Sequence, residues 1–259
     1  MRKERSFYFG VQIFGACPVE KKGRTVVIEV ITRTFTPEIL AYLLGGAWLV
    51  IELSVVIVIC SIFFGLILAL LRSYDRFILG RLAGAYIEIF RNTPNLMWVL
   101  ICYVYAPLPT AFLRCSFAFV LFTSAAIAEI IRGGLNSIPR GQFEAASSQG
   151  FNFVQTLVYI ILPQCFQNIV PTLLSQVITV VKDTSFLSMV AVAELMFRSR
   201  NALALLPRYT GQTVGIAQVA VIFGFAALIY FAINFTLSCI VRHMQKRRKM
   251  KAQLASGQA

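Results

Sequence analysis

The stretch EAASSQGFNFVQTLVYIILP, residues 144–163, begins with small polar residues and ends with an apolar run closed by a proline. Long apolar segments lie on both sides of it in the chain. The stretch is a plain loop between membrane-spanning helices, an amphipathic helix lying on lipid headgroups, or a surface on which another protein docks. These three alternatives have to be separated by the rest of the sequence.

Local signals predict two short helices around this stretch. Ser137 can cap a helix that tolerates Pro139 in its first turn, and Gly150 suits the left-handed position at a helix end. A second helix is expected from Asn152 to about residue 162, where Pro163 should stop it. The small residues at 145–148 would let another surface approach the backbone closely, with Phe143, Phe151 and Phe153 available to fill pockets on a partner.

The composition indicates an integral membrane protein. The 259 residues are 58% hydrophobic and only 14% charged, with a mean hydropathy of +0.75. Uncharged runs lie between Glu52 and Arg72, Arg91 and Arg114, Glu144 and Lys182, and Arg208 and Arg242. A membrane crossing needs about 20 apolar residues, and helices satisfy their own backbone hydrogen bonds in lipid. We therefore predict an all-α integral membrane protein.

About five membrane-spanning helices are expected. They are placed at about residues 47–71, 92–106, 115–131, 165–181 and 215–241. A short interfacial helix should precede the first span, starting near Thr36 and Pro37 and broken at Gly45 and Gly46. An earlier start of the second span, near Tyr86, is the alternative, and Pro107 and Pro109 should end it.

The positions of the basic residues predict the orientation in the membrane. The formal net charge is +13, and Lys and Arg gather next to the apolar segments, as topology determinants do. The segments after the first span, after the third span and after the fifth span are basic and are placed in the cytoplasm. The N-terminus is then outside, although residues 1–33 carry seven basic residues, which prefer the inside. We interpret 1–36 as a basic extension, 37–243 as one membrane domain with a loop at 132–163, and 244–259 as a basic cytoplasmic tail.

The sequence contains no recognisable catalytic constellation. It has no GxxxxGK[ST] phosphate-binding loop, so energy from ATP would have to come from another subunit. The six cysteines are scattered, and His243 is the only histidine, which argues against a metal site or a disulfide framework. We do not expect an enzyme.

Four motifs, in order, resemble the permease subunits of ABC importers, in the branch that takes up polar amino acids. The motifs are YIEIFRNTP at 86–94, AEIIRGGLNSIPRGQ at 128–142, the EAA segment with its glycine and Ile-x-Leu-Pro at 144–163, and VVKDTSFLSMVAVAEL at 180–195. The resemblance covers about residues 35–248. It implies the MetI-like fold of ABC permeases, with a cytoplasmic coupling helix.

The resemblance assigns a role to the opening stretch. In this family the loop seats in a groove of the ATPase subunit, and Glu144, Ala145, Ala146 and Gly150 are the corresponding coupling positions here. It implies two copies of an ATPase, a second permease subunit that is identical or paralogous, an extracytoplasmic binding protein and membrane lipid, without nucleic acid. The chain would bind no cofactor itself, because the partner ATPase would use ATP and Mg²⁺.

Ionisable residues at membrane depth are functional candidates. The candidates for the substrate path are Lys182, Asp183, Thr184 and Ser185, because a zwitterionic amino acid offers partners to both charges. The alternative is that Lys182 and Asp183 form an ion pair at the outer end of the fourth span that only marks an interface.

A second group is assigned structural or gating roles. Glu129 and Arg132 are interpreted as a structural pair near the cytoplasmic boundary. Arg91, Thr93 and Pro94 are expected to fix the entry of the second span.

The expected function is a polar amino acid permease of the cytoplasmic (inner) membrane, energised through the loop by a separate ATPase. An ion-gradient-driven secondary amino acid transporter is the main alternative, but such carriers usually show inverted repeats, which are not visible here. A membrane-embedded enzyme and a scaffold or regulatory membrane protein are further alternatives.

Overall fold

The regular elements of the described chain are all helices. The computed structural model describes residues 30–255 except for 33, 76, 191 and 212. In chain order the elements are α2 (Pro37–Tyr74), α3 (Ile78–Arg91), α4 (Asn95–Tyr105), α5 (Ala111–Asn136), α6 (Gly141–Ser148), α7 (Phe153–Gln155), the π-helical η1 (Thr156–Ile161), α8 (Leu162–Asp183), the 3-10 helix η2 (Thr184–Val190), α9 (Leu195–Thr210) and α10 (Ile216–Ala255). The predicted extension at 1–36 lies mostly outside the described residues.

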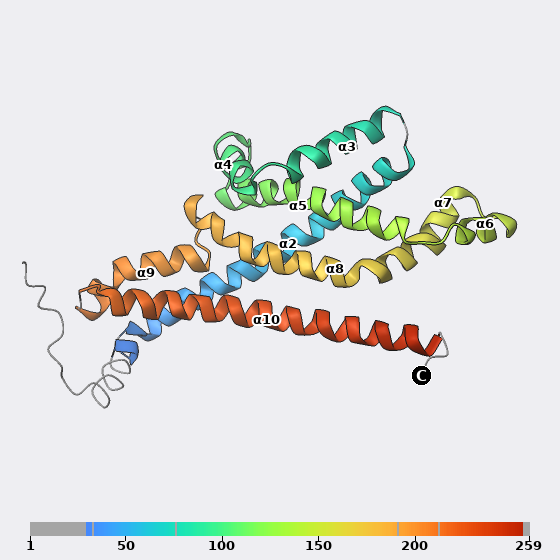
Figure 1. The fold of residues 1–259 in the computed structure, drawn as a ribbon. Coiled ribbons are helices and arrows are strands. Elements are labelled where there is room, and N and C mark those ends of the chain that lie inside the picture. Colours follow the sequence, from blue (N-terminus) through green and yellow to red (C-terminus); the bar gives the residue numbers. More distant parts are fainter. Residues whose placement is uncertain (1–29, 33, 76, 191, 212, 256–259) are drawn as a thin grey trace, which may run out of the picture.

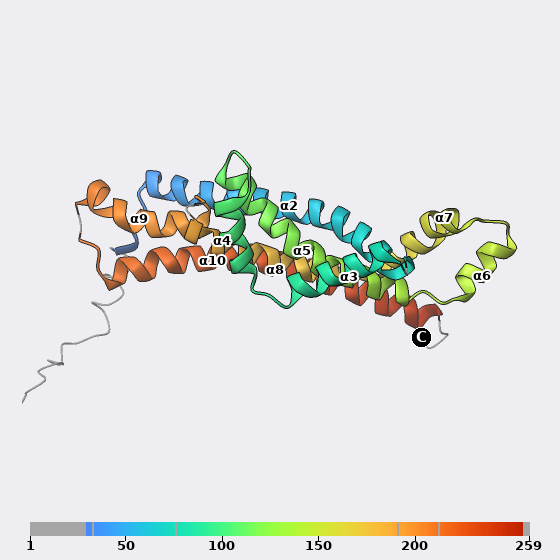
Figure 2. The same cartoon turned by 90° about the horizontal axis from the view of Figure 1, so that it is seen from above.

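The long helices run side by side in an elongated bundle (Figures 1 and 2). α2, α5 and α10 run in one direction, α3 and α8 run back, and α4 lies across the bundle. The short helices α6 and α7 and the last turns of α10 lie toward one end, which we call the α6 end. α9 and the start of α2 lie toward the opposite end, the α9 end.

Four helical stretches are long and apolar enough to cross a membrane. They are Pro37–Tyr74, Ala111–Asn136, Phe153–Val190 and Ile216–Arg247. The predicted second span at 92–106 is not among them, because it corresponds to α4 alone, a shorter apolar helix that α3 precedes as a separate helix. With 11 residues, α4 is about 16 Å long and cannot cross a bilayer alone.

The break between α3 and α4 has a local cause. Pro94 lacks an N–H and pushes Thr93 away from helical geometry. The side chains of Asn92 and Thr93 donate hydrogen bonds to the carbonyl oxygens of Glu88 and Ile89, at 2.8 and 2.7 Å. They thereby satisfy the last turn of α3 and end it. α3 and α4 are therefore separate helices, and only α4 coincides with the predicted second span.

The predicted interfacial helix before the first span is wrong, because α2 continues through Gly45 and Gly46 without interruption. Thr36 caps its start by accepting a hydrogen bond from the Ile39 N–H. The two glycines serve packing instead. A Cβ atom on Gly46 would lie 2.9 Å from the Cα atom of Leu195, so the absent side chain allows α9 to lie against α2.

We expect Gly46→Leu to force α9 away from α2. Overpacking of this kind costs about 2 kcal/mol, which corresponds to a loss of roughly 5 °C in thermal midpoint for a chain of this size. The midpoint of the detergent-purified protein measures it. Gly224→Leu is the matched control, because nothing lies within 4 Å of a Cβ atom on that α10 glycine. Equal midpoints for the two variants would contradict the packing role of Gly46.

Helix α9 was not predicted from the sequence, and a buried carboxylate begins it. Glu194 is fully buried and accepts hydrogen bonds from the Met196 and Phe197 N–H groups, both at 2.8 Å. The Tyr230 hydroxyl of α10 donates a third, also at 2.8 Å. Burial raises the pKa of Glu194, and these three hydrogen bonds oppose that shift. Glu194 therefore ties α9 to α10 at the α9 end.

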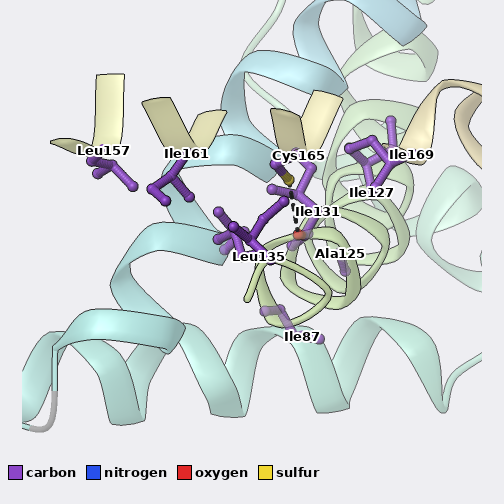
Figure 3. Close-up of a cluster of buried hydrophobic side chains, with 12 residues drawn as sticks. Ile87, Ala125, Ile127, Ile131, Leu135, Leu157, Ile161, Cys165 and Ile169 are labelled. Carbon is purple, nitrogen blue, oxygen red and sulfur yellow. Dashed lines mark hydrogen bonds between the residues drawn. The ribbon is translucent and has the colours of Figure 1, made fainter. Parts of the chain in front are cut away.

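An apolar cluster toward the α6 end joins α3, α5, η1 and α8 (Figure 3). Its labelled members are Ile87, Ala125, Ile127, Ile131, Leu135, Leu157, Ile161, Cys165 and Ile169. The Cys165 Sγ lies 3.6 Å from the Ile131 carbonyl oxygen, which shows how closely α5 and α8 approach each other. Because Leu157 and Ile161 belong to η1, this cluster fixes the segment that follows α6 to the bundle.

Candidate coupling surface and translocation site

The segment around α6 forms the helix–turn–helix that the sequence predicts, with a different start. Ser137 ends α5, where its N–H and hydroxyl both donate to the Gly134 carbonyl, and Arg140 occupies the cap position of α6. The expectation that Ser137 caps α6 is therefore wrong. α5 extends to Asn136, and Ser137 is the residue that caps the end of α5.

The end of α6 is the glycine-dependent turn that the sequence predicts. Gly150 has φ of 81°, and its N–H donates to the Ser147 carbonyl, at 3.0 Å. The Phe151 N–H donates to the Ala146 carbonyl, at 3.1 Å, which completes a Schellman motif. A side chain at position 150 would be strained at this φ, so the turn requires glycine.

Four of the small or acidic positions on α6 are solvent-accessible. Glu144, Ala145, Ser147 and Ser148 are exposed, whereas Ala146 is 3% exposed and faces the bundle. The open face therefore carries one carboxylate among small side chains. Such a face can receive another surface at short backbone distance.

The three phenylalanines of this segment have different roles. Phe151 and Phe153 are exposed, at 39% and 52%, and Phe153 packs edge-on against Tyr74. Phe143 is half-buried against the apolar cluster of Figure 3, so it belongs to the bundle and does not extend toward a partner. The expectation that all three fill partner pockets is thus wrong for Phe143.

Pro163 does not stop the second helix, which also corrects the sequence prediction. Asn152 and Gln155 form a reciprocal capping box at its start. The helix then passes through η1, whose wider turn ends with the Leu162 N–H donating to the Leu157 carbonyl, and continues as α8. A π turn gives room for the ring of Pro163, which would clash with the carbonyl four residues earlier in a regular α-helix.

An ion network links α2, α3 and α5. Glu129 is 16% exposed in its side chain and contacts Arg72, Arg91 and Arg132 at 3.0, 3.4 and 2.8 Å. Arg72 also contacts Glu88, at 2.8 Å. The predicted Glu129–Arg132 pair is present, and Arg91 joins it from the end of α3. Arg72 and Glu88 were not predicted, because their separation in sequence hides the contact.

The four substrate-path candidates do not form one surface. Lys182 is exposed and Asp183 is half-buried at the end of α8. Thr184 is fully buried and donates its hydroxyl to the Val181 carbonyl, so it points into the protein. The Ser185 hydroxyl donates to the carbonyl of Lys182. Lys182 and Asp183 therefore remain the candidates with accessible charge.

Two polar residues near the helix break extend this site. Asn95, the first residue of α4, donates to the Asp183 carboxylate, at 2.8 Å. Thr93 accepts a hydrogen bond from the Trp98 indole, at 2.7 Å, and Pro94 precedes α4. Sequence reasoning missed Asn95, although an amide directly after a proline-marked break between apolar runs is a signal that it could have used.

The chain matches a known family over most of its length. The sequence profile of the family described as "Binding-protein-dependent transport system inner membrane component" matches residues 61–250. The chain belongs to this family. The family description, an inner membrane component, agrees with the four helices that are long and apolar enough to cross a membrane. The matched region contains α6, the ion network and the Asn95–Asp183 pair.

Individual relatives of this family member cover most of its length. A probable glutamine ABC transporter permease protein, GlnP of Bacillus subtilis, is 36% identical over 220 residues, covering 83% of this chain and 97% of the relative. The glutamate/aspartate import permease protein GltK of Escherichia coli is 33% identical, covering 80% and 94%.

Solved structures of similar fold include that of an amino acid ABC transporter with histidines. It has a TM-score of 0.68 and 27% identity, and the match covers 80% of this chain and 94% of that one. The MetNI methionine ABC transporter in inward-facing form matches with a TM-score of 0.63 at 18% identity, covering 81% of this chain and 99% of that one. This second likeness concerns the fold, which is the MetI-like all-helical fold expected from the sequence.

Proposed function

We propose that this family member is the permease subunit of an ABC importer for polar amino acids. The observation that carries the proposal is the small-residue helix α6, which presents Glu144 and Ala145 on an open face at one end of the bundle. Relatives that the chain covers almost completely are named as permeases for glutamine and for glutamate/aspartate. Those names favour an ATP-driven importer, and none of them favours a carrier driven by an ion gradient.

The α6 end is assigned to the cytoplasm. The basic residues Arg72, Arg81, Arg132 and Arg140 lie in or beside the segments that reach this end, and α10 also ends there with Arg242, Lys246 and Arg247. Lys and Arg near the ends of spans favour the cytoplasmic side. In the cytoplasmic (inner) membrane, residue 37 would then lie outside and the end of α10 inside.

The proposed assembly contains two ATPase subunits, a second permease and a binding protein. α6 would be the coupling helix, whose open face seats against the ATPase. Large apolar side chains along α2 and α10 support contact with lipid and with a second permease: Trp48, Ile59, Phe63, Leu228, Phe231 and Phe235 are exposed in the single chain. The chain itself would supply positioning and a path, while the partner hydrolyses ATP.

The substrate path is proposed to pass Lys182 and Asp183. An α-amino acid carries an ammonium and a carboxylate, and the two side chains offer a complementary charge to each. Pairing between opposite charges at membrane depth is far stronger than in water, because the dielectric screening is weaker.

The test of the function is reconstitution. The tagged chain is purified with its partners in mild detergent and placed in proteoliposomes with the binding protein, and uptake of tritiated L-glutamine, L-glutamate and L-arginine is measured. We expect uptake that requires ATP on the ATPase side and a co-purifying ATPase. Uptake driven by an ion gradient without ATP, from a preparation free of ATPase, would overturn the proposal and favour a secondary carrier.

Asp183→Asn is expected to reduce uptake and to weaken selectivity for the α-ammonium group. The change keeps the size of the side chain but removes the charge. Uptake of L-glutamine should fall about tenfold, as expected for the loss of a hydrogen bond to a charged group. Ser185→Ala serves as the control, since the Ser185 hydroxyl is used by its own backbone. Normal uptake with unchanged selectivity in Asp183→Asn would reduce the pair to a structural contact.

A further inference from the structure

We propose that Asn95 is a positioning residue that holds the Asp183 carboxylate in the orientation that receives the α-ammonium group of the transported amino acid. This inference rests on the proposed function, because it requires Asp183 to lie on the substrate path. The one polar contact between α4 and α8 that carries it is the hydrogen bond from the Asn95 side chain to the Asp183 side chain.

The geometry joins two separate parts of the chain. The Asn95 Nδ2 atom lies 2.8 Å from the Asp183 Oδ2 atom, and the residues are 88 positions apart in the sequence. Asn95 is the first residue of α4, and Asp183 is the last residue of α8. Both are half-buried. The contact therefore holds the start of α4 against the end of α8.

The chemical type of the donor matters. A neutral amide orients a carboxylate without cancelling its charge, whereas an arginine would neutralise it. Glu129 illustrates the opposite case, since three arginines surround it and leave no charge for a ligand. In the described part of the chain, Asn95 is the donor to Asp183, and no donor reaches the Oδ1 atom of that carboxylate. The one donor is thus uncharged, and one carboxylate oxygen of Asp183 remains for an ammonium group.

Asn95 is itself held in place. The Trp98 indole donates to the Thr93 hydroxyl across the first turn of α4, and the Trp98 ring lies 4.4 Å from the Phe90 ring of α3, measured between centroids. These contacts bracket Asn95 on both sides of the break at Pro94. A side chain on such a fixed turn can orient a partner with little loss of entropy on binding.

The experiment measures how much ATP is hydrolysed for each amino acid transported. Complexes carrying Asn95→Ala or Asn95→Gln are reconstituted with the ATPase and the binding protein, and tritiated L-glutamine uptake and phosphate release are recorded together. Asn92→Ala is the matched control. It lies in the same connection and loses an amide bonded to Glu88 rather than to Asp183.

Asn95→Ala should raise the ratio of ATP hydrolysed to L-glutamine transported about tenfold, the factor that corresponds to losing one hydrogen bond to a charged group. A substrate that is poorly held leaves the path while the ATPase cycle continues. Asn95→Gln retains an amide donor and should restore most of the coupling. Asn92→Ala should change the ratio by less than about twofold, because it leaves the contact to Asp183 in place.

Two results would overturn the inference. An unchanged ratio in Asn95→Ala would show that Asp183 needs no orientation. An equal increase in Asn92→Ala and Asn95→Ala would assign the effect to the stiffness of the break. Failure of the proposed function would give a different result: the unmodified complex would show no ATP-dependent uptake of L-glutamine, L-glutamate or L-arginine.

Discussion

Glu144→Lys should abolish ATP-dependent uptake while leaving the protein in the membrane at its normal level. Glu144 is exposed on the open face of α6, so the substitution does not disturb the bundle. It replaces the one carboxylate of that face by a cation, and a like charge opposite a partner's basic group or helix N-terminus costs several kcal/mol. We expect at least about a hundredfold loss of uptake, together with loss of the co-purifying ATPase.

Two controls separate docking from other effects of the charge. Glu144→Gln keeps the shape of the side chain and should retain part of the coupling. Gln245→Lys adds a cation to an exposed position on α10 toward the same end of the bundle, outside the open face of α6. Normal uptake in Glu144→Lys, or an equal loss in Gln245→Lys, would rule out α6 as the site of ATPase contact.

Glu129→Gln is expected to cause the largest loss of stability among single changes of similar shape. The amide fills the same space but leaves Arg72, Arg91 and Arg132 beside one another without their shared carboxylate. Breaking a partly buried ion network costs up to a few kcal/mol. The thermal midpoint of the detergent-purified chain should fall by about 5 °C or more.

The matched comparison for this change is Glu88→Gln. Glu88 contacts Arg72 in the same network, but its side chain is 56% exposed against 16% for Glu129. Solvent screens exposed ion pairs, so Glu88→Gln should shift the midpoint by less than about 2 °C. If the two variants melt alike, the network acts as a loose surface cluster and Glu129 is not its centre.

Apolar runs in the sequence predicted the long helices, because length and hydropathy alone decide which segments can cross a bilayer. The turn at Gly150 was equally accessible, since it needs only a glycine after a short helix. The boundary near Pro94 was predicted as the entry of the second span, but the 11-residue length of α4, too short to cross a bilayer alone, was not. The continuation of the chain through Pro163 was missed because a π turn leaves no mark in the residue pattern.

Local features of the site could be predicted from the sequence, whereas contacts between distant residues could not. Helix α6 and its glycine turn could be predicted from neighbouring residues, since they are local structure. Asn95 with Asp183, and Arg72 with Glu129, lie 88 and 57 positions apart and form only when the bundle does. Gly45 and Gly46 were misinterpreted because a glycine signals a break in isolation, whereas here it marks where α9 presses against α2.

The uninterrupted helical course from Phe153 to Asp183 has a mechanical consequence. Over these 31 residues, α7, η1 and α8 form one continuous helical segment about 45 Å long. Backbone hydrogen bonds along this helix would carry a displacement of α6 toward Asp183, and Pro171 inside α8, which lacks an N–H, is the position where the helix can bend. Asn95 belongs to α4, which is not part of this helix. A displacement of α8 along its axis would therefore move the Asp183 carboxylate relative to the Asn95 amide. The hydrogen bond between them would have to break and re-form during such a movement.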